Sequence, residues 1–246
     1  MQLNTGYLRW IAGGTVVLTA LAVAWGLLYG LGGVLARLPG AQITALRIEG
    51  ELHHLNRGAL EKTAWQAVQG NLFNVDVAQV SNSLGRIAWV RSVNVRRQWP
   101  GQLTVSIEEH APLAYWGEAA LVNTLGERFV APFTGELPRF NGPAGTEIDM
   151  MQRYRTYTAI LRPTQRKVAV LGLSARWAWQ IKLDSGLTLE LGRSDMEARL
   201  DRFVAAYVRL PWLAEARGGY LDLRYPNGFA AKLAPSGKTA SAHSAN

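Results

Sequence analysis

The sequence predicts an α+β protein with one N-terminal transmembrane helix, followed by two folded units that each contain helices and strands. Three observations support this prediction. The run from Trp10 to Ala36 carries no charged residue. Residues 43–112 then show hydrophobic periodicities in the order β-α-α-β-β. Residues 113–233 contain several short strand patterns and two helical ones, as expected for a mixed β-domain with flanking helices.

The uncharged run is long enough to cross a membrane. About 20 apolar residues in an α-helix, at a rise of about 1.5 Å each, span a hydrocarbon core of roughly 30 Å. Aromatic residues at Trp10 and Tyr29 mark the limits of such a span, because their rings prefer the membrane interface. We therefore predict an anchor over residues 10–36 with its core at residues 10–29, preceded by a cytoplasmic stub of residues 1–9.

A cleaved signal peptide is the alternative interpretation of this run. Ala22-Val23-Ala24 has the small-x-small pattern of a cleavage site. The apolar part of a signal peptide is only about 7–15 residues long, however, and cleavage after Ala24 would leave an apolar segment at the new N-terminus. The length of the run therefore favours an anchor.

Small residues lie on one face of the predicted anchor. Ala22, Gly26 and Gly30 are spaced four residues apart, which lets two membrane helices approach closely. These three residues are candidates for packing against another membrane helix.

Charge and composition bear on location and partners. The stub is short, so we expect the N-terminus to lie inside the cytoplasm and the C-terminal bulk to lie outside it. The net charge is +8, but the 26 Lys and Arg residues are scattered, which argues against a nucleic-acid partner. The absence of Cys excludes disulfides, thiol catalysis and Cys-bound metals.

The first folded unit is predicted from its periodicities. A short strand covers Ile43–Gly50, and Asn56 is a plausible N-cap for a first helix, which a second helical pattern over residues 77–87 follows. Apolar and polar residues then alternate on both sides of Trp99-Pro100-Gly101, which predicts a hairpin.

The second unit has two helical patterns, at residues 148–161 and 196–208, of which the latter is the more strongly amphipathic. Leu137–Gly145 is rich in Pro and Gly and is predicted to be a loop. The predicted strands cover residues 115–116, 121–123, 128–130, 168–173, 179–183, 187–191, 221–225 and 229–233. Residues 234–246 are rich in Ser and Ala and are predicted to be disordered.

Strand geometry assigns the residues of the 221–225 segment to two faces. Leu221, Leu223 and Tyr225 are expected on the core face, because side chains alternate along a strand. Asp222 and Arg224 are expected on the opposite face as a surface ion pair.

Catalytic motifs are missing from the sequence. It contains neither an HExxH nor a G-x-S-x-G pattern, and Gly237-Lys238-Thr239 lacks the first glycine of a P-loop. We therefore expect a protein that is not an enzyme and that has no catalytic, cofactor-binding or metal-binding residues.

Spaced motifs in the first unit resemble a POTRA domain. They are Val93-x-Val95-x-Arg97-x-Trp99-Pro100, then Leu103-x-Val105-x-Ile107, then Glu109-x-x-Pro112. Such domains are docking modules in outer-membrane assembly proteins, in two-partner secretion transporters and in the FtsQ/DivIB division family. The Arg-x-Trp-Pro corner is most similar to the division family.

The second unit resembles the β-domain of the same family. The motifs are Trp179-x-Ile181-x-Leu183-Asp-Ser-Gly186, then Arg199-Leu200-x-Arg202-Phe203, and the terminal block from Leu221 to Ala230. The resemblance covers residues 1–235 in the order anchor, POTRA domain (residues 43–112) and β-domain (residues 113–233). It implies a non-enzymatic, bipartite scaffold of the bacterial divisome at the division septum. It also implies single-pass type II topology in the cell inner membrane, with the N-terminus cytoplasmic and the C-terminal domain periplasmic.

The resemblance also implies partners and a docking site. FtsB is expected to bind the last strands directly and to arrive with FtsL, and other inner-membrane division proteins are candidates for the POTRA domain and the membrane helix. The implied contact residues are Tyr225, Asn227, Gly228, Phe229, Ala230, Ala231 and Leu233. Small residues in this set let another backbone approach, so a partner strand can pair with an exposed edge. Some family members have Trp near the position of Leu233, and Leu233 keeps the apolar area but lacks the indole N–H donor.

Two other hypotheses remain open. One is a POTRA-type chaperone or docking protein of envelope assembly or secretion. Such proteins carry a C-terminal membrane barrel, for which about 120 residues after the first unit leave too little room. The other is a membrane-anchored domain that binds or hydrolyses the cell wall, and it predicts activity on peptidoglycan that a scaffold lacks.

Overall fold

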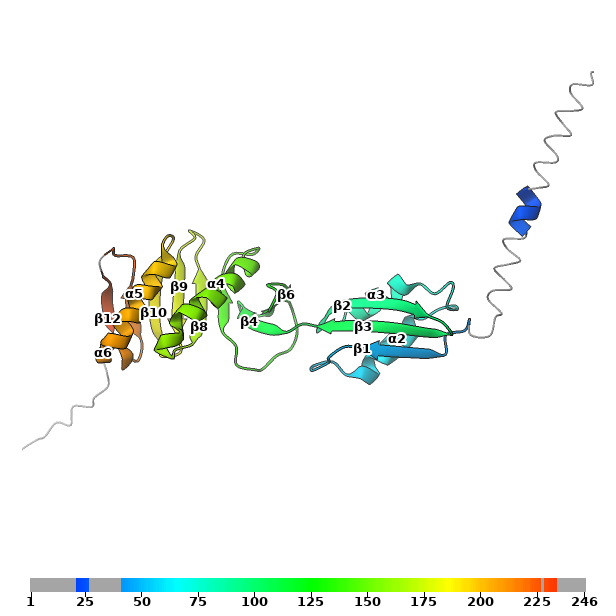
Figure 1. The fold of residues 1–246 in the computed structure, drawn as a ribbon, viewed down its shortest axis with the longest axis horizontal. Helices are drawn as coiled ribbons and strands as arrows, with labels where there is room; N and C mark the ends of the chain where they lie inside the picture. The colour runs from blue at the N-terminus through cyan, green and yellow to red at the C-terminus, as the bar shows by residue number, and fades with distance from the viewer. Residues whose placement is uncertain (1–20, 27–40, 227, 234–246) are drawn as a thin grey trace, which may run out of the picture. The chain divides into compact units, whose positions relative to one another are not determined.

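The computed structural model describes residues 21–26, 41–226 and 228–233. They form two compact units that divide between Glu109 and His110, and both contain helices and strands, which confirms the predicted α+β class (Figure 1). Residues 21–26 are helical. Over the described ranges, no helix combines the length and the apolar character that a membrane span requires. The stub, the tail and the remainder of the predicted anchor lie outside the described residues.

The first unit has the predicted order of elements. They are β1 (Ala45–Glu49), α2 (Arg57–Ala67), α3 (Val77–Gly85), β2 (Val90–Gln98) and β3 (Gln102–Glu109). The sheet has the order β1-β3-β2, in which β1 is parallel and β2 antiparallel to β3. Leu60 and Ala64 of α2 and Val80 and Leu84 of α3 form one core with apolar residues of the sheet. The two helices therefore stabilise one face of this sheet.

Side-chain caps start both helices of the first unit. Asn56 accepts a hydrogen bond from the backbone N–H of Ala59 at 3.1 Å, which confirms the predicted N-cap. Asp76 accepts hydrogen bonds from the N–H groups of Ala78 and Gln79 at 2.9 and 3.1 Å. Because the first N–H groups of a helix have no partner within it, these caps fix where each helix begins.

The second unit is built on one mixed nine-stranded sheet. Its strands are β4 (Pro112–Trp116), β5 (Ala120–Asn123), β6 (Arg128–Phe129), β7 (Arg139–Asn141), β8 (Val168–Leu173), β9 (Trp179–Leu183), β10 (Leu187–Gly192), β11 (Gly219–Asp222) and β12 (Ala230–Leu233). The order across the sheet is β12-β11-β10-β9-β8-β7-β4-β5-β6. The helices are α4 (Glu147–Leu161), the 3-10 turn η1 (Arg162–Thr164), α5 (Met196–Arg209) and α6 (Pro211–Ala214).

Helices α4 and α5 pack against each other and lie across the strands from β8 to β10 (Figure 1). Tyr157 of α4 and Phe203 of α5 are fully buried in the core that they share with the sheet. The predicted hairpin between β9 and β10 is confirmed, and Gly186 occupies its turn with φ +85°, a value that favours glycine. Helix α5 lies next to β10, which is followed in the sheet by β11 and β12.

Predictions about β7 and about one face of α4 were wrong, and helix α6 was missed. The segment predicted as a loop over Leu137–Gly145 contains β7, which pairs in parallel with β4 and β8 and buries Phe140. Ile148 was placed on the apolar face of the first helix, but it is 54% exposed. Helix α6 was not predicted, although it buries Leu213. Strand β7 was missed because Pro and Gly in its segment are typical of a loop, and α6 was missed because four residues are too few to show a helical period.

Replacing Asp76 with Ala should destabilise the first unit by about 1 kcal/mol, because two N–H groups at the start of α3 lose their partner. Asp76→Asn is the matched control, since its amide oxygen can still accept a hydrogen bond. Urea unfolding of the full chain in detergent measures both variants. Equal stability of the Ala and Asn variants would show that the cap contributes nothing.

Candidate partner-binding edge

Strands β11 and β12 form the end of the nine-stranded sheet to which the predicted docking residues belong. Strand β11 is parallel to β10 and antiparallel to β12. The sheet order ends at β12, and no other strand among the described residues pairs with its outer edge. An edge of this kind carries backbone N–H and C=O groups that can pair with another strand.

The direction of the backbone groups in β11 follows from one hydrogen bond. The N–H of Leu223 donates to the carbonyl oxygen of Glu190 in β10 at 3.0 Å. Along a strand, the backbone N–H and C=O groups of successive residues point to opposite sides. The groups of Leu221, two residues before Leu223, therefore also point toward β10. Tyr220 and Asp222 therefore direct their N–H and C=O groups toward β12.

The register carries this alternation into β12. Ala230 lies opposite Asp222, and Lys232 lies opposite Tyr220. They therefore form the hydrogen-bonded pairs with β11. Ala231 and Leu233 consequently direct their N–H and C=O groups outward, away from the sheet. These two residues of the predicted docking set carry the backbone groups that a partner strand can use.

The turn between the two strands differs from its prediction. Strand β11 ends at Asp222, so Tyr225 does not share a buried face with Leu221 and Leu223 as predicted. Its side chain is 54% exposed. The guanidinium of Arg202 on α5 donates to the carbonyl oxygen of Tyr225 at 3.4 Å. Helix α5 therefore holds the backbone of the turn while the Tyr225 ring remains accessible.

A small cavity lies beside the turn. It has a volume of about 120 Å³ and is lined by Arg199, Arg202, Phe203, Leu223, Gly228 and Phe229. Phe229 is half-buried and packs against the core, whereas Gly228 is exposed. Because β12 begins at Ala230, both residues precede the strand that was predicted to start at Phe229. The cavity can accept a small apolar side chain next to two cationic groups.

The sequence prediction did not include the two arginines of this cavity. Arg199 and Arg202 lie three residues apart on α5, so they share one side of the helix. Arg199 donates to the carbonyl oxygen of Leu191 at 2.5 Å. Two basic residues at this spacing, next to the buried positions of an amphipathic helix, were the signal that could have identified them.

Asp222 and Arg224 form an ion pair, but Asp222 does not lie on the surface as predicted. It is only 8% exposed. The Arg224 guanidinium donates to both of its carboxylate oxygens, at 2.9 Å from Nε and 2.7 Å from Nη2. These hydrogen bonds lower the pKa of Asp222 and outweigh its burial, which acts in the opposite direction. The pair fixes the chain where it leaves β11 for the turn.

The remaining predicted site residues are placed as follows. Ala230 and Ala231 are exposed, and Leu233 is half-buried against the core. Asn227 lies outside the described residues. Of the small-residue face on the anchor, Ala22 and Gly26 lie in the described helical segment and are exposed, whereas Gly30 lies outside the described residues. The structure therefore brings together the described docking residues that follow β11.

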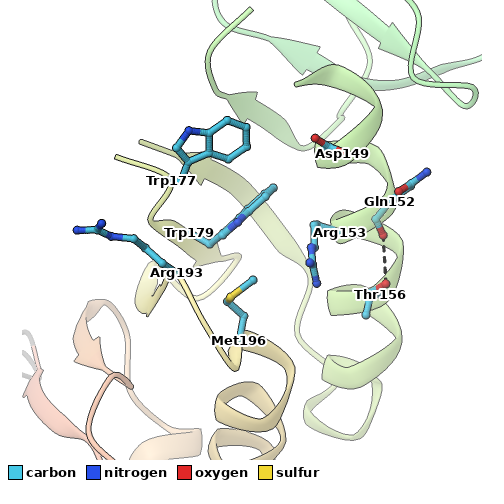
Figure 2. Close-up of a pocket in the computed structure, with 8 residues that line it drawn as sticks. All are labelled: Asp149, Gln152, Arg153, Thr156, Trp177, Trp179, Arg193 and Met196. Atoms are coloured by element: carbon cyan, nitrogen blue, oxygen red, sulfur yellow. Dashed lines mark hydrogen bonds between the residues drawn. The ribbon is translucent and has the colours of Figure 1, made fainter. Parts of the chain in front are cut away.

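A second concave region lies between α4, β9 and the start of α5 (Figure 2). It has a volume of about 450 Å³ and is lined by Asp149, Gln152, Arg153, Thr156, Trp177, Trp179, Arg193 and Met196. Arg153 is paired with Glu197 at 2.8 Å. Trp177 is 56% exposed at the rim, and Trp179 is buried. None of the predicted docking residues lines this region. Within the described ranges, no three His, Asp or Glu side chains lie close enough to hold a metal ion.

Comparisons with known proteins agree with this two-unit architecture. The POTRA domain of FtsQ type matches residues 41–110, and the C-terminal domain of cell division protein FtsQ/DivIB matches residues 114–224. The chain is 39% identical over 183 residues to cell division protein FtsQ of Nitrosospira multiformis, covering 74% of this chain and 78% of the relative. It belongs to the FtsQ/DivIB family. The resemblance drawn from the sequence is confirmed.

Two further relatives from this family extend the match. Cell division protein FtsQ of Bordetella pertussis is 37% identical over 253 residues, which cover 92% of each chain. The protein of the same name from Burkholderia pseudomallei is 37% identical over 210 residues, covering 81% of this chain and 83% of the relative. The match to the FtsQ/DivIB C-terminal domain ends at Arg224, so the turn and β12 lie beyond it.

The Asp222–Arg224 pair should make stability depend on pH. The pKa of Asp222 is lower in the folded chain than in the unfolded chain, where it is about 3.9. The stabilisation is therefore fully present above the unfolded-state pKa and is lost as pH falls through the folded-state pKa. Asp222→Asn should be less stable than the wild type at pH 7, and this difference should shrink toward pH 3. Urea unfolding at both pH values tests this, and a constant difference would contradict it.

Proposed function

We propose that the chain is a single-pass inner-membrane scaffold of the bacterial divisome, with the cytoplasmic N-terminus and the periplasmic C-terminal domains of type II topology. The relatives named cell division protein FtsQ and the family membership support a role in cell division. The proposed mechanism is non-enzymatic: the POTRA domain and the β-domain bind other division proteins at the septum.

The observation that carries this proposal is the outer edge of β12. Its outward N–H and C=O groups on Ala231 and Leu233 can complete a hydrogen-bonded ladder with a partner strand. Ala230 and Ala231 are exposed and small, so another backbone meets little steric hindrance. The proposed partner is FtsB, which binds this edge directly and brings FtsL with it.

Side chains around the edge would add specificity to the backbone pairing. Tyr225 is exposed and Phe229 lines the small cavity, so both can pack against apolar residues of the partner. Arg199 and Arg202 at the rim favour an acidic residue on the incoming segment, because opposite charges across an interface steer and orient binding. The partner segment is therefore expected to combine an extended strand with a neighbouring acidic and apolar stretch.

Membrane anchoring would make modest contacts effective. Partners held in the same membrane meet at a high effective concentration, so several weak interactions combine into strong binding. In this scheme the β-domain captures FtsB and FtsL, while the POTRA domain and the small-residue face of the anchor remain available to other inner-membrane division proteins.

Proline at position 231 provides a sharp test of strand addition. Ala231→Pro removes one outward N–H group without removing a hydrogen bond to β11, so the β-domain should stay folded. Binding of a purified FtsB–FtsL complex to the full chain in detergent should fall about tenfold or more, which corresponds to about 1.4 kcal/mol.

Ala231→Ser is the matched control, because it keeps the N–H group and remains small. It should bind within about twofold of the wild type, a difference of about 0.4 kcal/mol. Wild-type affinity of a folded Ala231→Pro variant would show that the partner does not pair with this edge.

A further inference from the structure

One end of the POTRA unit is built from three segments that meet in space. They are residues 41–46, 68–77 and 98–103. The N–H of Leu72 donates to the carbonyl oxygen of Ala41 at 2.8 Å, and the N–H of Thr44 donates to that of Gly101 at 2.8 Å. These hydrogen bonds tie the start of the described domain to the helix–helix loop and to the β2–β3 turn. We call this end the tip.

Two large aromatic side chains stand exposed on the tip. Phe73 is 49% exposed and Trp99 is 54% exposed. Their ring centroids lie 6.1 Å apart at an interplanar angle of 41°. Phe73 belongs to the loop between α2 and α3, and Trp99 to the turn between β2 and β3. The two rings therefore form one apolar patch from segments that are distant in sequence.

The tip is almost without charge, although the rest of the unit is not. Asp76 is the single charged residue in its three segments, and its carboxylate is used to cap α3. The opposite end of the unit, by contrast, is rich in charge and includes Glu49, Glu51, Arg57, Arg86, Arg91, Glu108 and Glu109. Charge is thus segregated along the length of the unit.

Two arginines lie directly behind the tip. Arg96 and Arg97 precede the uncharged segment that contains Trp99, and both are exposed. The Arg97 guanidinium also donates to the carbonyl oxygen of Val75 at 2.7 Å. An aromatic end followed by cationic side chains is the arrangement that matches an anionic lipid surface, with rings at the interface and cations at the headgroups.

Chain length places this end of the domain near the membrane. Ala36, the last residue of the predicted anchor, is five residues before Ala41, and a chain of five residues spans at most about 18 Å. If the span already ends at Tyr29, the limit is about 43 Å. This step rests on the proposed anchoring of the chain. The tip is the end of the POTRA unit that the anchor reaches first.

We propose that the tip binds the surface of the anionic inner membrane, with Phe73 and Trp99 inserted at the interface and Arg96 and Arg97 beside the lipid headgroups. A tether alone would leave the POTRA unit free to change its distance from the bilayer. Binding through the tip gives the unit a fixed depth and presents its charged end away from the membrane.

Site-directed spin labelling tests this on the full chain, because the chain contains no cysteine. Gln98→Cys places a label on the tip, and Ala88→Cys places one at the opposite end of β2, where both native residues are exposed. The nine residues of β2 separate the two positions by roughly 30 Å at about 3.3 Å per residue. The chain is reconstituted into nanodiscs with anionic phospholipid, and collision with oxygen and with a water-soluble nickel chelate reports depth.

The label at position 98 should be several-fold less accessible to the nickel chelate than the label at position 88. Phe73→Glu should abolish this protection, because a carboxylate opposes insertion next to anionic lipid, whereas Phe73→Trp should retain it. Equal exposure of the two labels would overturn the proposal. Protection that persists in Phe73→Glu would also overturn it, since tethering rather than insertion would then explain the result.

A third label separates this inference from the proposed anchoring. Leu21→Cys lies within the predicted span, and its label should report the hydrocarbon core. If it does while position 98 is exposed to water, the anchoring stands and the membrane-binding tip is wrong. If position 21 is itself in water, the anchoring is wrong and the proposal for the tip falls with it.

Discussion

Strand β12 is held in the sheet through a single neighbour, β11, and the docking surface depends on that pairing. Backbone N–H and C=O groups need partners, and a strand at the end of a sheet satisfies only the half that faces inward. In β12 the inward half belongs to Ala230 and Lys232, and the outward half to Ala231 and Leu233. The same alternation that attaches β12 to the protein leaves it able to accept another strand.

Helix α5 links the core of the β-domain to this surface. Its buried side, with Leu200 and Phe203, packs into the core that supports β10 and β11. Its neighbouring side carries Arg199 and Arg202, which bind backbone carbonyl groups and line the cavity next to Phe229. A change that loosens α5 would therefore alter both the position of the turn and the charge presented to a partner.

The longer elements could be predicted because their patterns extend over enough residues. Two helical patterns and a hairpin with alternating residues gave the order of the first unit, and Asn56 could be identified as a cap from its residue type and position. Strand β7 could not be predicted, because its segment is rich in Pro and Gly and because its pairing with β4 and β8 depends on segments far away in the sequence. Sheet order is set by such long-range contacts, which local patterns do not contain.

The candidate site was predicted only in part, because its geometry also depends on long-range contacts. The resemblance pointed to the residues after β11, but the alternation that placed Asp222 on the surface ignored its neighbours in the folded sheet. Asp222 is buried because the chain leaves the strand at that residue and Arg224 folds back onto its carboxylate. The direction of the groups on Ala231 likewise became clear only from the register with β11.

Amide hydrogen exchange at single-residue resolution tests the proposed strand addition most directly. In the free chain, the N–H groups of Ala231 and Leu233 should exchange faster than those of Ala230 and Lys232, which are bonded to β11. When the FtsB–FtsL complex is added, the N–H groups of Ala231 and Leu233 should become protected, because a partner strand accepts their hydrogen bonds. If the partner binds and these two amides still exchange at the rate of the free chain, the edge of β12 is not where it docks.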